Sequence, residues 1–230
     1  MQTKSNAVTQ AASIAEDVNA FLAKVKAMPP STGQGRLVFA MDATMSRQPT
    51  WDSALSLQGQ MFMEARKAGG LAVQLVYFRG FNECRASRWV TNPEALATMM
   101  TKVDCRGGNT QIGKVLVHIK SEAQKGKINA VIFVGDACEE GIDGLCQKAG
   151  EIGLLGVPLF MFQEGNDGTA EKAFREVAKL TSGAYFKLDS NAPKILADLL
   201  GAVAAYASGG KQALESKGTS TARALLQQLK

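Results

Sequence analysis

Oxygen-bearing side chains follow two apolar, strand-like segments of this chain and one loop that contains glycine. The apolar segment 37–41 is followed by Asp-Ala-Thr-Met-Ser, the segment 130–134 is followed by Gly-Asp, and residues 107–110 read Gly-Gly-Asn-Thr. The candidate ligands in these positions are Asp42, Thr44, Ser46, Thr110 and Asp136. Two carboxylates and three hydroxyls are hard oxygen donors, which suit Mg²⁺ or Mn²⁺ better than zinc or copper.

The alternate spacing of Asp42, Thr44 and Ser46 is informative. Residues two apart in an extended loop point to the same side, so these three side chains can face one cation. Structural roles compete with this interpretation, because Asp often caps turns and Thr110 could be the N-cap of the following helix. The set of five favours a metal site over these separate structural roles.

The remaining composition excludes several classes of function. The chain has one histidine, His118, which we expect to be a solvated surface residue, so coordination by oxygen alone is predicted. The net charge of +5 over 230 residues includes no basic block of the kind that tracks phosphates, and we predict no nucleic-acid partner. A content of 46% hydrophobic and 20% charged residues is ordinary for a globular protein.

Neither a membrane span nor a disulfide framework is indicated. The most apolar stretch, 195–207, contains Asp198 and is too short to cross a bilayer. The four cysteines show no C-x-x-C spacing. We therefore predict a cytoplasmic protein with reduced thiols and no membrane insertion, with pairing of Cys84 and Cys105 as the alternative.

Apolar runs of strand length alternate with amphipathic runs of helix length. Strands are predicted at 37–41, 71–78, 130–134, 157–162 and 184–188, and helices at 51–67, 93–103, 112–124, 145–152, 170–180 and 193–207. Continuously apolar strands are typical of a parallel sheet that is buried on both faces. The segment 82–91 is predicted to be an antiparallel edge strand. The sequence thus predicts a doubly wound, mostly parallel six-stranded α/β sheet, in which the carboxyl ends of the strands would bring the candidate ligands together.

The chain is predicted to have three parts. Residues 1–34 form an amphipathic N-terminal helix with a Pro-Pro linker, 35–209 form the α/β domain, and 210–230 form a C-terminal helical extension. We expect both terminal helices to pack on their own domain rather than on a partner.

The strand order and the five candidate ligands resemble the von Willebrand factor A (VWA) domain family, which carries metal-ion-dependent adhesion sites (MIDAS). The family pattern is D-x-S-x-S after the first strand, a Thr in a glycine-bearing loop, and an Asp after the fourth strand. Asp42, Thr44, Ser46, Thr110 and Asp136 match these positions, with Thr44 in place of the first Ser. The resemblance covers roughly 35–209 and implies a Rossmann-like sheet with helices on both faces. It also implies a divalent cation, held mainly by the hydroxyls directly and by the carboxylates partly through water.

This resemblance implies a non-enzymatic function. A metal with few anionic ligands stays electrophilic and keeps a coordination position open, which an Asp or Glu of a partner protein can complete. By resemblance, the module would belong to a cytosolic multiprotein system, with an AAA+ ATPase as one candidate partner. An alternative is that Glu139 or Glu140, where the family often has glycine, occupies the open position itself.

Two enzymatic alternatives are weaker. A phosphatase could use Asp42 as the phosphoryl acceptor with Lys114 as a basic residue, but such enzymes usually carry a second Asp where this chain has Thr44. An NTPase could use the G-x-x-x-x-G-K match from Gly108 to Lys114. However, Val115 replaces the Ser or Thr that would hold Mg²⁺, and the segment is predicted to follow a helix rather than a strand.

Overall fold

The computed structural model describes residues 35–48, 71–188 and 201–202 of the chain. The helix predicted at 51–67, most of the one predicted at 193–207, and both terminal segments lie outside the described residues. The three-part division of the chain therefore stays a prediction.

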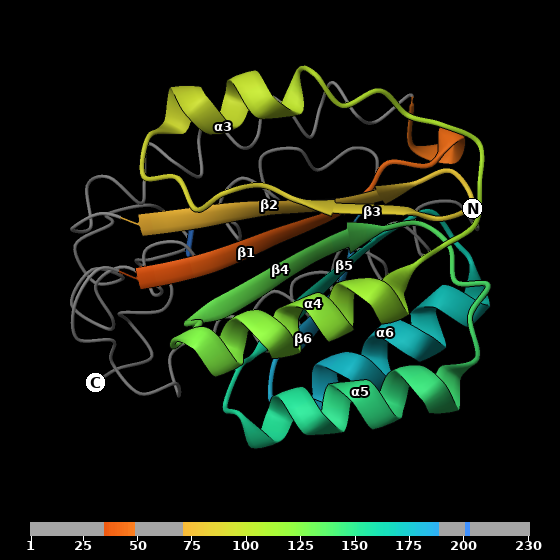
Figure 1. The fold of residues 1–230 in the computed structure, drawn as a ribbon. Helices are drawn as coiled ribbons and strands as arrows, with labels where there is room; N and C mark the ends of the chain where they lie inside the picture. Colours follow the sequence, from red (N-terminus) through yellow and green to blue (C-terminus); the bar gives the residue numbers. More distant parts are fainter. Residues whose placement is uncertain (1–34, 49–70, 189–200, 203–230) are drawn as a thin grey trace, which may run out of the picture.

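A mixed sheet of six strands forms the centre of the described structure, in the order β3-β2-β1-β4-β5-β6 (Figure 1). Its strands are β1 (Gly35–Asp42), β2 (Leu71–Arg79), β3 (Glu83–Ala86), β4 (Ala130–Gly135), β5 (Leu159–Glu164) and β6 (Ala184–Leu188). β3 at the edge is antiparallel to β2, and all other neighbours are parallel. This confirms the predicted fold class.

The bounds of two strands differ from the prediction. β3 ends at Ala86, and only an isolated bridge between Val73 and Val90 continues the pairing expected over 82–91. β5 begins at Leu159 rather than at residue 157, because Pro158 has no N–H to donate to a neighbouring strand.

Helices cover both faces of the sheet (Figure 1). α3 (Pro93–Met100) lies on one face, and α4 (Ile112–Lys125), α5 (Ile142–Leu154) and α6 (Gly168–Leu180) lie on the other. Asn92 caps α3 through its side chain and is followed by proline in the first turn. A short 3-10 helix, η1 (Met45–Arg47), follows β1.

The buried faces explain why the strands are continuously apolar. Leu37 and Phe39 of β1 belong to the core cluster on the α3 side, whereas Val38 and Ala40 belong to the cluster under α4, α5 and α6. Each large apolar side chain buried in this way stabilises the fold by about 1.5–3 kcal/mol. On the second face, Phe133 of β4 and Phe174 of α6 meet edge to face, with ring centroids 5.3 Å apart.

The register brings the carboxyl ends of β1, β2 and β4 to one edge of the sheet. Asp42 pairs with Phe78, and Met41 pairs with Val134. The segments that leave this edge are 43–48, 80–82 and 136–141, and the segment 101–111 joins them before α4. These four segments carry the candidate site, at the place where ligands bind in open α/β sheets.

Candidate metal centre

Asp42 is the last residue of β1 and is fully buried. Its Oδ1 atom accepts a hydrogen bond of 2.7 Å from the backbone N–H of Thr44. Its Oδ2 atom is buried and has no hydrogen-bond partner among the described residues. One carboxylate oxygen therefore holds the loop in place, and the other finds no partner within 35–48, 71–188 and 201–202.

The hydroxyls of Thr44 and Ser46 lie side by side, with their Oγ atoms 3.1 Å apart. Thr44 has an extended backbone (φ −75°, ψ 165°) directly before η1. Thr44 is buried and Ser46 is exposed, so the pair runs from the interior to the surface. The two hydroxyls therefore share one side of the loop, as the alternate spacing predicts.

Asp136 follows β4 directly, beside the end of β1. Its Oδ1 atom is also buried without a hydrogen-bond partner among the described residues. Burial raises the pKa of Asp42 from 3.8 to about 6, against hydrogen bonds from Thr44, and the negative charge of Asp136 adds to the rise. The two carboxylates are therefore close enough to repel each other.

These residues fit a divalent cation. A buried carboxylate oxygen without a partner is costly, and buried charges in proteins are normally paired or coordinate a metal. A cation between Asp42 and Asp136 would satisfy both oxygens and remove the repulsion between the two charges. Within the described ranges, no group of three or more His, Cys, Asp or Glu side chains could hold a metal, so a cation here would also need the hydroxyls.

Thr110 joins the loop before α4 to the segment after β4. Its Oγ1 atom accepts a hydrogen bond of 3.0 Å from the backbone N–H of Glu139, and its own N–H donates to Oε2 of Glu139, also at 3.0 Å. The N-cap of α4 is Gln111, without a side-chain hydrogen bond, so the helix-cap role considered for Thr110 is wrong. The Thr110 hydroxyl keeps a second lone pair that could bind a cation.

Glu139 and Glu140 both bind backbone amides in the segment 110–113. Oε1 of Glu140 accepts from the N–H of Ile112, and Oε2 accepts from the N–H of Gly113 at 2.9 Å. A Cβ atom on Gly113 would lie 2.9 Å from Oε2 of Glu140, so glycine permits this close approach. The two glutamates thus hold the start of α4, where negative charge is favourable. The alternative in which one of them occupies the open metal position stays a prediction.

Arg47 is a site residue that the sequence did not reveal. Its side chain is fully buried and forms an ion pair with Glu164 at the end of β5. The positive charge of Arg47 also counters the rise in the pKa of Asp42. Arginine side chains are rarely buried, so the residue type did not point to the interior. Only the position of Arg47 directly after Ser46 indicated that it lies near the candidate site.

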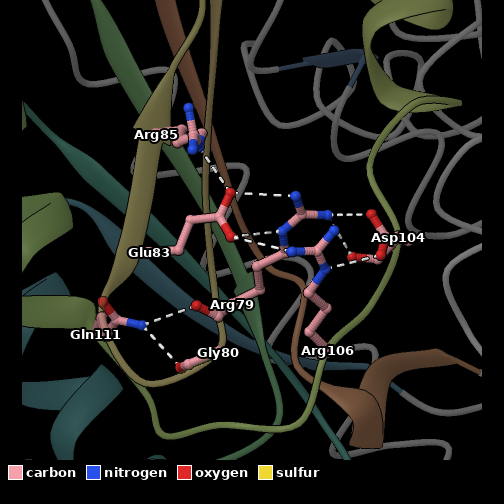
Figure 2. A network of polar contacts seen from close by, with 7 residues as sticks. All are labelled: Arg79, Gly80, Glu83, Arg85, Asp104, Arg106 and Gln111. Atoms are coloured by element: carbon pink, nitrogen blue, oxygen red, sulfur yellow. Dashed lines mark hydrogen bonds and ion pairs between the residues drawn. The ribbon is translucent and has the colours of Figure 1, made fainter.

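A network of charged residues links the β2–β3 hairpin to the segment 101–111 (Figure 2). Arg79 donates to both carboxylate oxygens of Glu83 at 3.1 Å and to the carbonyl of Asp104 at 2.9 Å. Arg106 donates from Nε to Asp104 at 2.9 Å and from its backbone N–H to the carbonyl of Ala43 at 3.0 Å. Hydrogen bonds from Arg106 and Arg79 lower the pKa of Asp104 to about 2.

Residues that carried the enzymatic alternatives have other partners. The ammonium group of Lys114 binds Oδ1 of Asn82 and, at 2.8 Å, Oε1 of Gln111. Gly113 and Lys114 lie inside α4, and the segment that begins at Gly108 follows α3 rather than a strand. Nothing in these contacts places Lys114 beside Asp42.

Two further expectations have clear outcomes. Cys84 and Cys105 are free thiols, so the alternative in which they form a disulfide is wrong. His118 is half-buried and lies 2.9 Å from Oε1 of Gln74 on β2, and burial lowers its pKa. The expectation of a solvated surface histidine was wrong, because this side of α4 packs over β2.

In the described part of the chain, no helix is long and apolar enough to span a bilayer.

No family model and no curated protein matches this sequence. Solved structures do match. A von Willebrand factor type A structure from Catenulispora acidiphila is 15% identical with a TM-score of 0.61, covering 77% of this chain and 43% of that one. Proximal thread matrix protein 1 from the mussel byssus, with a zinc-occupied MIDAS motif, is 17% identical with a TM-score of 0.61, covering 75% and 46%.

A third match is an aerotolerance-related membrane protein from Bacteroides fragilis, 16% identical with a TM-score of 0.55, covering 72% of this chain and 98% of that one. This chain therefore spans less than half the length of the first two structures. At these identities the comparisons establish the architecture. The described chain has the fold of a VWA domain.

Proposed function

We propose that this protein is a metal-dependent protein-binding module. The metal, Mg²⁺ or Mn²⁺, is held by the five predicted ligands, Asp42, Thr44, Ser46, Thr110 and Asp136. The observation that carries the proposal is a pair of buried carboxylate oxygens, one at the end of β1 and one after β4, that have no hydrogen-bond partner among the described residues and lie near two adjacent hydroxyls. A solved structure of the same fold with a zinc-occupied MIDAS motif supports a cation site of this type.

The ligand types define what the site can do. Bound metal would act as an electrophile that accepts an Asp or Glu carboxylate from a partner protein. Asp42 and Asp136 balance the charge of a divalent cation, and the hydroxyls bind without adding negative charge. The amide of Thr44 orients Asp42, and Glu139 orients Thr110. No bond is made or broken, so the proposed protein is not an enzyme.

The proposed setting is a cytoplasmic multiprotein system, with an AAA+ ATPase as one candidate class of partner. This part of the proposal is supported by the family resemblance of the sequence. It includes no nucleic acid and no insertion into a membrane.

Calorimetric titration of Mg²⁺ and Mn²⁺ into the protein tests the site. The wild type should bind one ion, whereas Asp42→Ala and Asp136→Ala should not bind. Asp143→Ala is the matched control, because Asp143 is an exposed carboxylate in the first turn of α5. Circular dichroism should verify that each variant is folded.

Turnover assays separate this proposal from the phosphatase and NTPase alternatives. We expect no hydrolysis of p-nitrophenyl phosphate or ATP above background with Mg²⁺ present. Hydrolysis that disappears in Asp42→Ala would overturn the non-enzymatic function.

A further inference from the structure

Three leucines are exposed where α5 and α6 end, at the edge of the sheet opposite the candidate metal centre. Leu154 is 90% exposed, Leu155 is 44% exposed and Leu180 is 41% exposed. They are three of the six large apolar side chains that are exposed in the part of the chain that the structure describes. Apolar side chains that gather in water indicate a surface that something covers, whereas single ones do not.

The two helix ends that carry these leucines touch each other. A Cβ atom on Gly153 would overlap the carbonyl oxygen of Leu180, so the backbones of α5 and α6 are in direct contact one residue before Leu154. Both chains then turn back toward the sheet, through Gly156 with a φ of 69° and Ser182 with a φ of 54°. The three leucines therefore lie on adjoining helix ends, and we call them the leucine patch.

The chain enters the sheet at this same edge. β1, β4, β5 and β6 are parallel, so their amino ends line up, and α5 and α6 lead directly into the amino ends of β5 and β6 (Figure 1). β4 alone separates β1 from β5, a distance of roughly 10 Å at the usual spacing of strands. The segment that precedes Gly35 therefore starts close to the leucine patch.

The sequence before β1 contains an apolar stripe. Apolar residues recur there at three- and four-residue spacing, which a helix places on one face: Val8, Ala11, Ala15, Val18, Leu22 and Val25. Residues 29–34 begin with Pro-Pro, connect the stripe to Gly35 and can span about 20 Å. This is about twice the distance between the amino ends of β1 and β5, so the stripe can reach the patch.

The size of the patch favours an occupant that is tethered to it. An interface that holds two separate proteins together takes about 20–30 residues from each side, far more than three leucines. A segment on a short linker has an effective concentration on the order of millimolar, so a few apolar contacts suffice to hold it. The leucine patch thus suits a segment of the same chain better than a second molecule.

We propose that residues 8–25 dock on the leucine patch of their own domain, with the apolar stripe against Leu154, Leu155 and Leu180. The docked segment covers the amino edge of the sheet and leaves the carboxyl edge, with the candidate metal ligands, open to a partner. The inference needs no bound metal, so it stands or falls separately from the proposed function.

Photo-crosslinking in the full chain tests the contact. The photoreactive amino acid p-benzoylphenylalanine is placed at position 154, and the cross-linked peptides are identified by mass spectrometry. We expect cross-links to residues 8–25 within a monomer. The same probe at position 81 is the matched control, because Phe81 is 80% exposed between β2 and β3 at the opposite edge, and it should not reach this segment.

Three results would overturn the proposal. Cross-links from position 154 to residues 8–25 that occur only in a dimer would make the patch an interface between copies of the chain. Cross-links to residues 203–230 would assign the patch to the other end of the chain. Equal cross-linking of residues 8–25 from positions 154 and 81, or none from position 154, would mean that the segment does not dock there.

Substitutions in the stripe give a second readout. Leu22→Asp places a charge on the stripe and should abolish the cross-link from position 154. Ala20→Asp is the matched control, because position 20 lies on the opposite side of a helix with this spacing, and it should keep the cross-link. Loss of the cross-link in both variants, or in neither, would contradict docking through the stripe.

Hydrogen exchange measures how tightly the segment docks. Leu154→Asp should accelerate the exchange of amides in residues 8–25 about 10-fold, because the docked state loses one buried leucine contact. Phe81→Asp should leave this exchange unchanged. Exchange in β4 and β5 should be the same in both variants and the wild type, which verifies that the domain stays folded. Equal exchange of residues 8–25 in Leu154→Asp and the wild type would refute the docking.

Discussion

The two ends of the sheet satisfy their polar groups differently. At the amino end of β1, Arg36 stacks on the ring of Trp89 at 4.0 Å and pairs with Glu122 at 3.4 Å, and the indole N–H of Trp89 donates to the same carboxylate at 2.9 Å. Asn129 accepts from the backbone N–H of Arg36 at 2.9 Å. In the part of the chain that the structure describes, no buried polar side-chain atom at this end lacks a partner.

At the carboxyl end of the strands, some atoms of buried charged groups lack such hydrogen-bond and ion-pair partners among the described residues. Oxygens of Asp42 and Asp136 have no hydrogen-bond partner in the described ranges, and the charge of Asp136 destabilises the ionised form of Asp42. The amino end is thus built for stability. The carboxyl end has buried acceptors that no described residue satisfies, as expected for a functional site that costs the fold some stability.

The largest expected effect compares an arginine from each end. Arg47→Ala should lower the free energy of unfolding by about 3–5 kcal/mol, because it leaves Glu164 without its buried partner. Arg36→Ala removes a partly exposed ion pair and a ring contact, and should cost only about 1 kcal/mol. Urea unfolding of both variants measures the two free energies of unfolding. Equal losses of unfolding free energy in the two variants would contradict the proposed difference between the two ends of the sheet.

Metal should stabilise the protein through the carboxyl end alone. At 100 times the dissociation constant, Mg²⁺ should add about 2.7 kcal/mol to the free energy of unfolding of the wild type. Asp136→Asn should abolish this gain, whereas Glu122→Gln at the amino end should keep it. Thermal unfolding with Mg²⁺ and with EDTA tests this. A gain that survives in Asp136→Asn would place the metal elsewhere.

Without metal, the ionised side chain of Asp42 should destabilise the folded state. Because burial raises its pKa to about 6, the ionised form that dominates at pH 7 opposes folding, and this penalty is absent below the unfolded pKa. Asp42→Asn should therefore stabilise the metal-free protein at pH 7, by on the order of 2 kcal/mol. Chemical denaturation in EDTA measures the free energy of unfolding of the wild type and the variant. Destabilisation by this substitution would mean that Asp42 is structurally satisfied.

Glu140 should behave as a structural residue within the functional end. Glu140→Ala removes the acceptor of two amides at the start of α4 and should cost about 1–2 kcal/mol. Hydrogen exchange at Ile112 and Gly113 should accelerate. Glu151→Ala, which removes a half-buried carboxylate paired with Lys120 on the neighbouring helix, should change the stability by less than about 0.5 kcal/mol. Unchanged exchange in Glu140→Ala would argue against its role as a cap.

The smallest expected effect on stability is at low pH, in the network of Arg79, Glu83, Asp104 and Arg106 beside the β2–β3 hairpin. Arg106 and Arg79 lower the pKa of Asp104 to about 2, so its contribution to stability is present above the unfolded value of 3.8 and is lost as the pH falls through 2. The stability difference between the wild type and Asp104→Asn should therefore shrink from pH 5 to pH 2.5. Because Asp104 is exposed, 1 M salt should shrink it as well. A stability difference that stays constant with pH would mean that the ion pairs of Asp104 do not stabilise the folded state.

The fold could largely be predicted from the sequence, because its signals are local. Continuously apolar runs marked five strands near their observed positions, and alternation with helices indicated a parallel sheet. Parallel strands end at the same edge, so the placement of Asp42 and Asp136 together followed from the topology alone. The short β3 was harder to predict, because an edge strand has a neighbour on one side only.

The roles of charged residues could not be predicted in this way. Glu139 and Glu140 find amide partners 27–29 residues earlier in the chain, and no local pattern encodes that contact. Arg47 is buried because β5 ends with Glu164 beside the segment 43–48, whereas arginine as a residue type favours the surface. His118 is likewise half-buried because Gln74 lies beneath α4.

The sequence by itself determined which residues form strands and helices, and at which edge of the sheet the oxygen side chains gather. Hydrophobic periodicity and strand direction are properties of short segments, and they suffice for that. Only the tertiary structure decided which carboxylates are paired and which keep a buried oxygen without a partner. That distinction depends on where distant parts of the chain place donors and charges. It separates Glu139 and Glu140, which bind backbone amides, from Asp42 and Asp136, which each have a buried oxygen without a partner among the described residues.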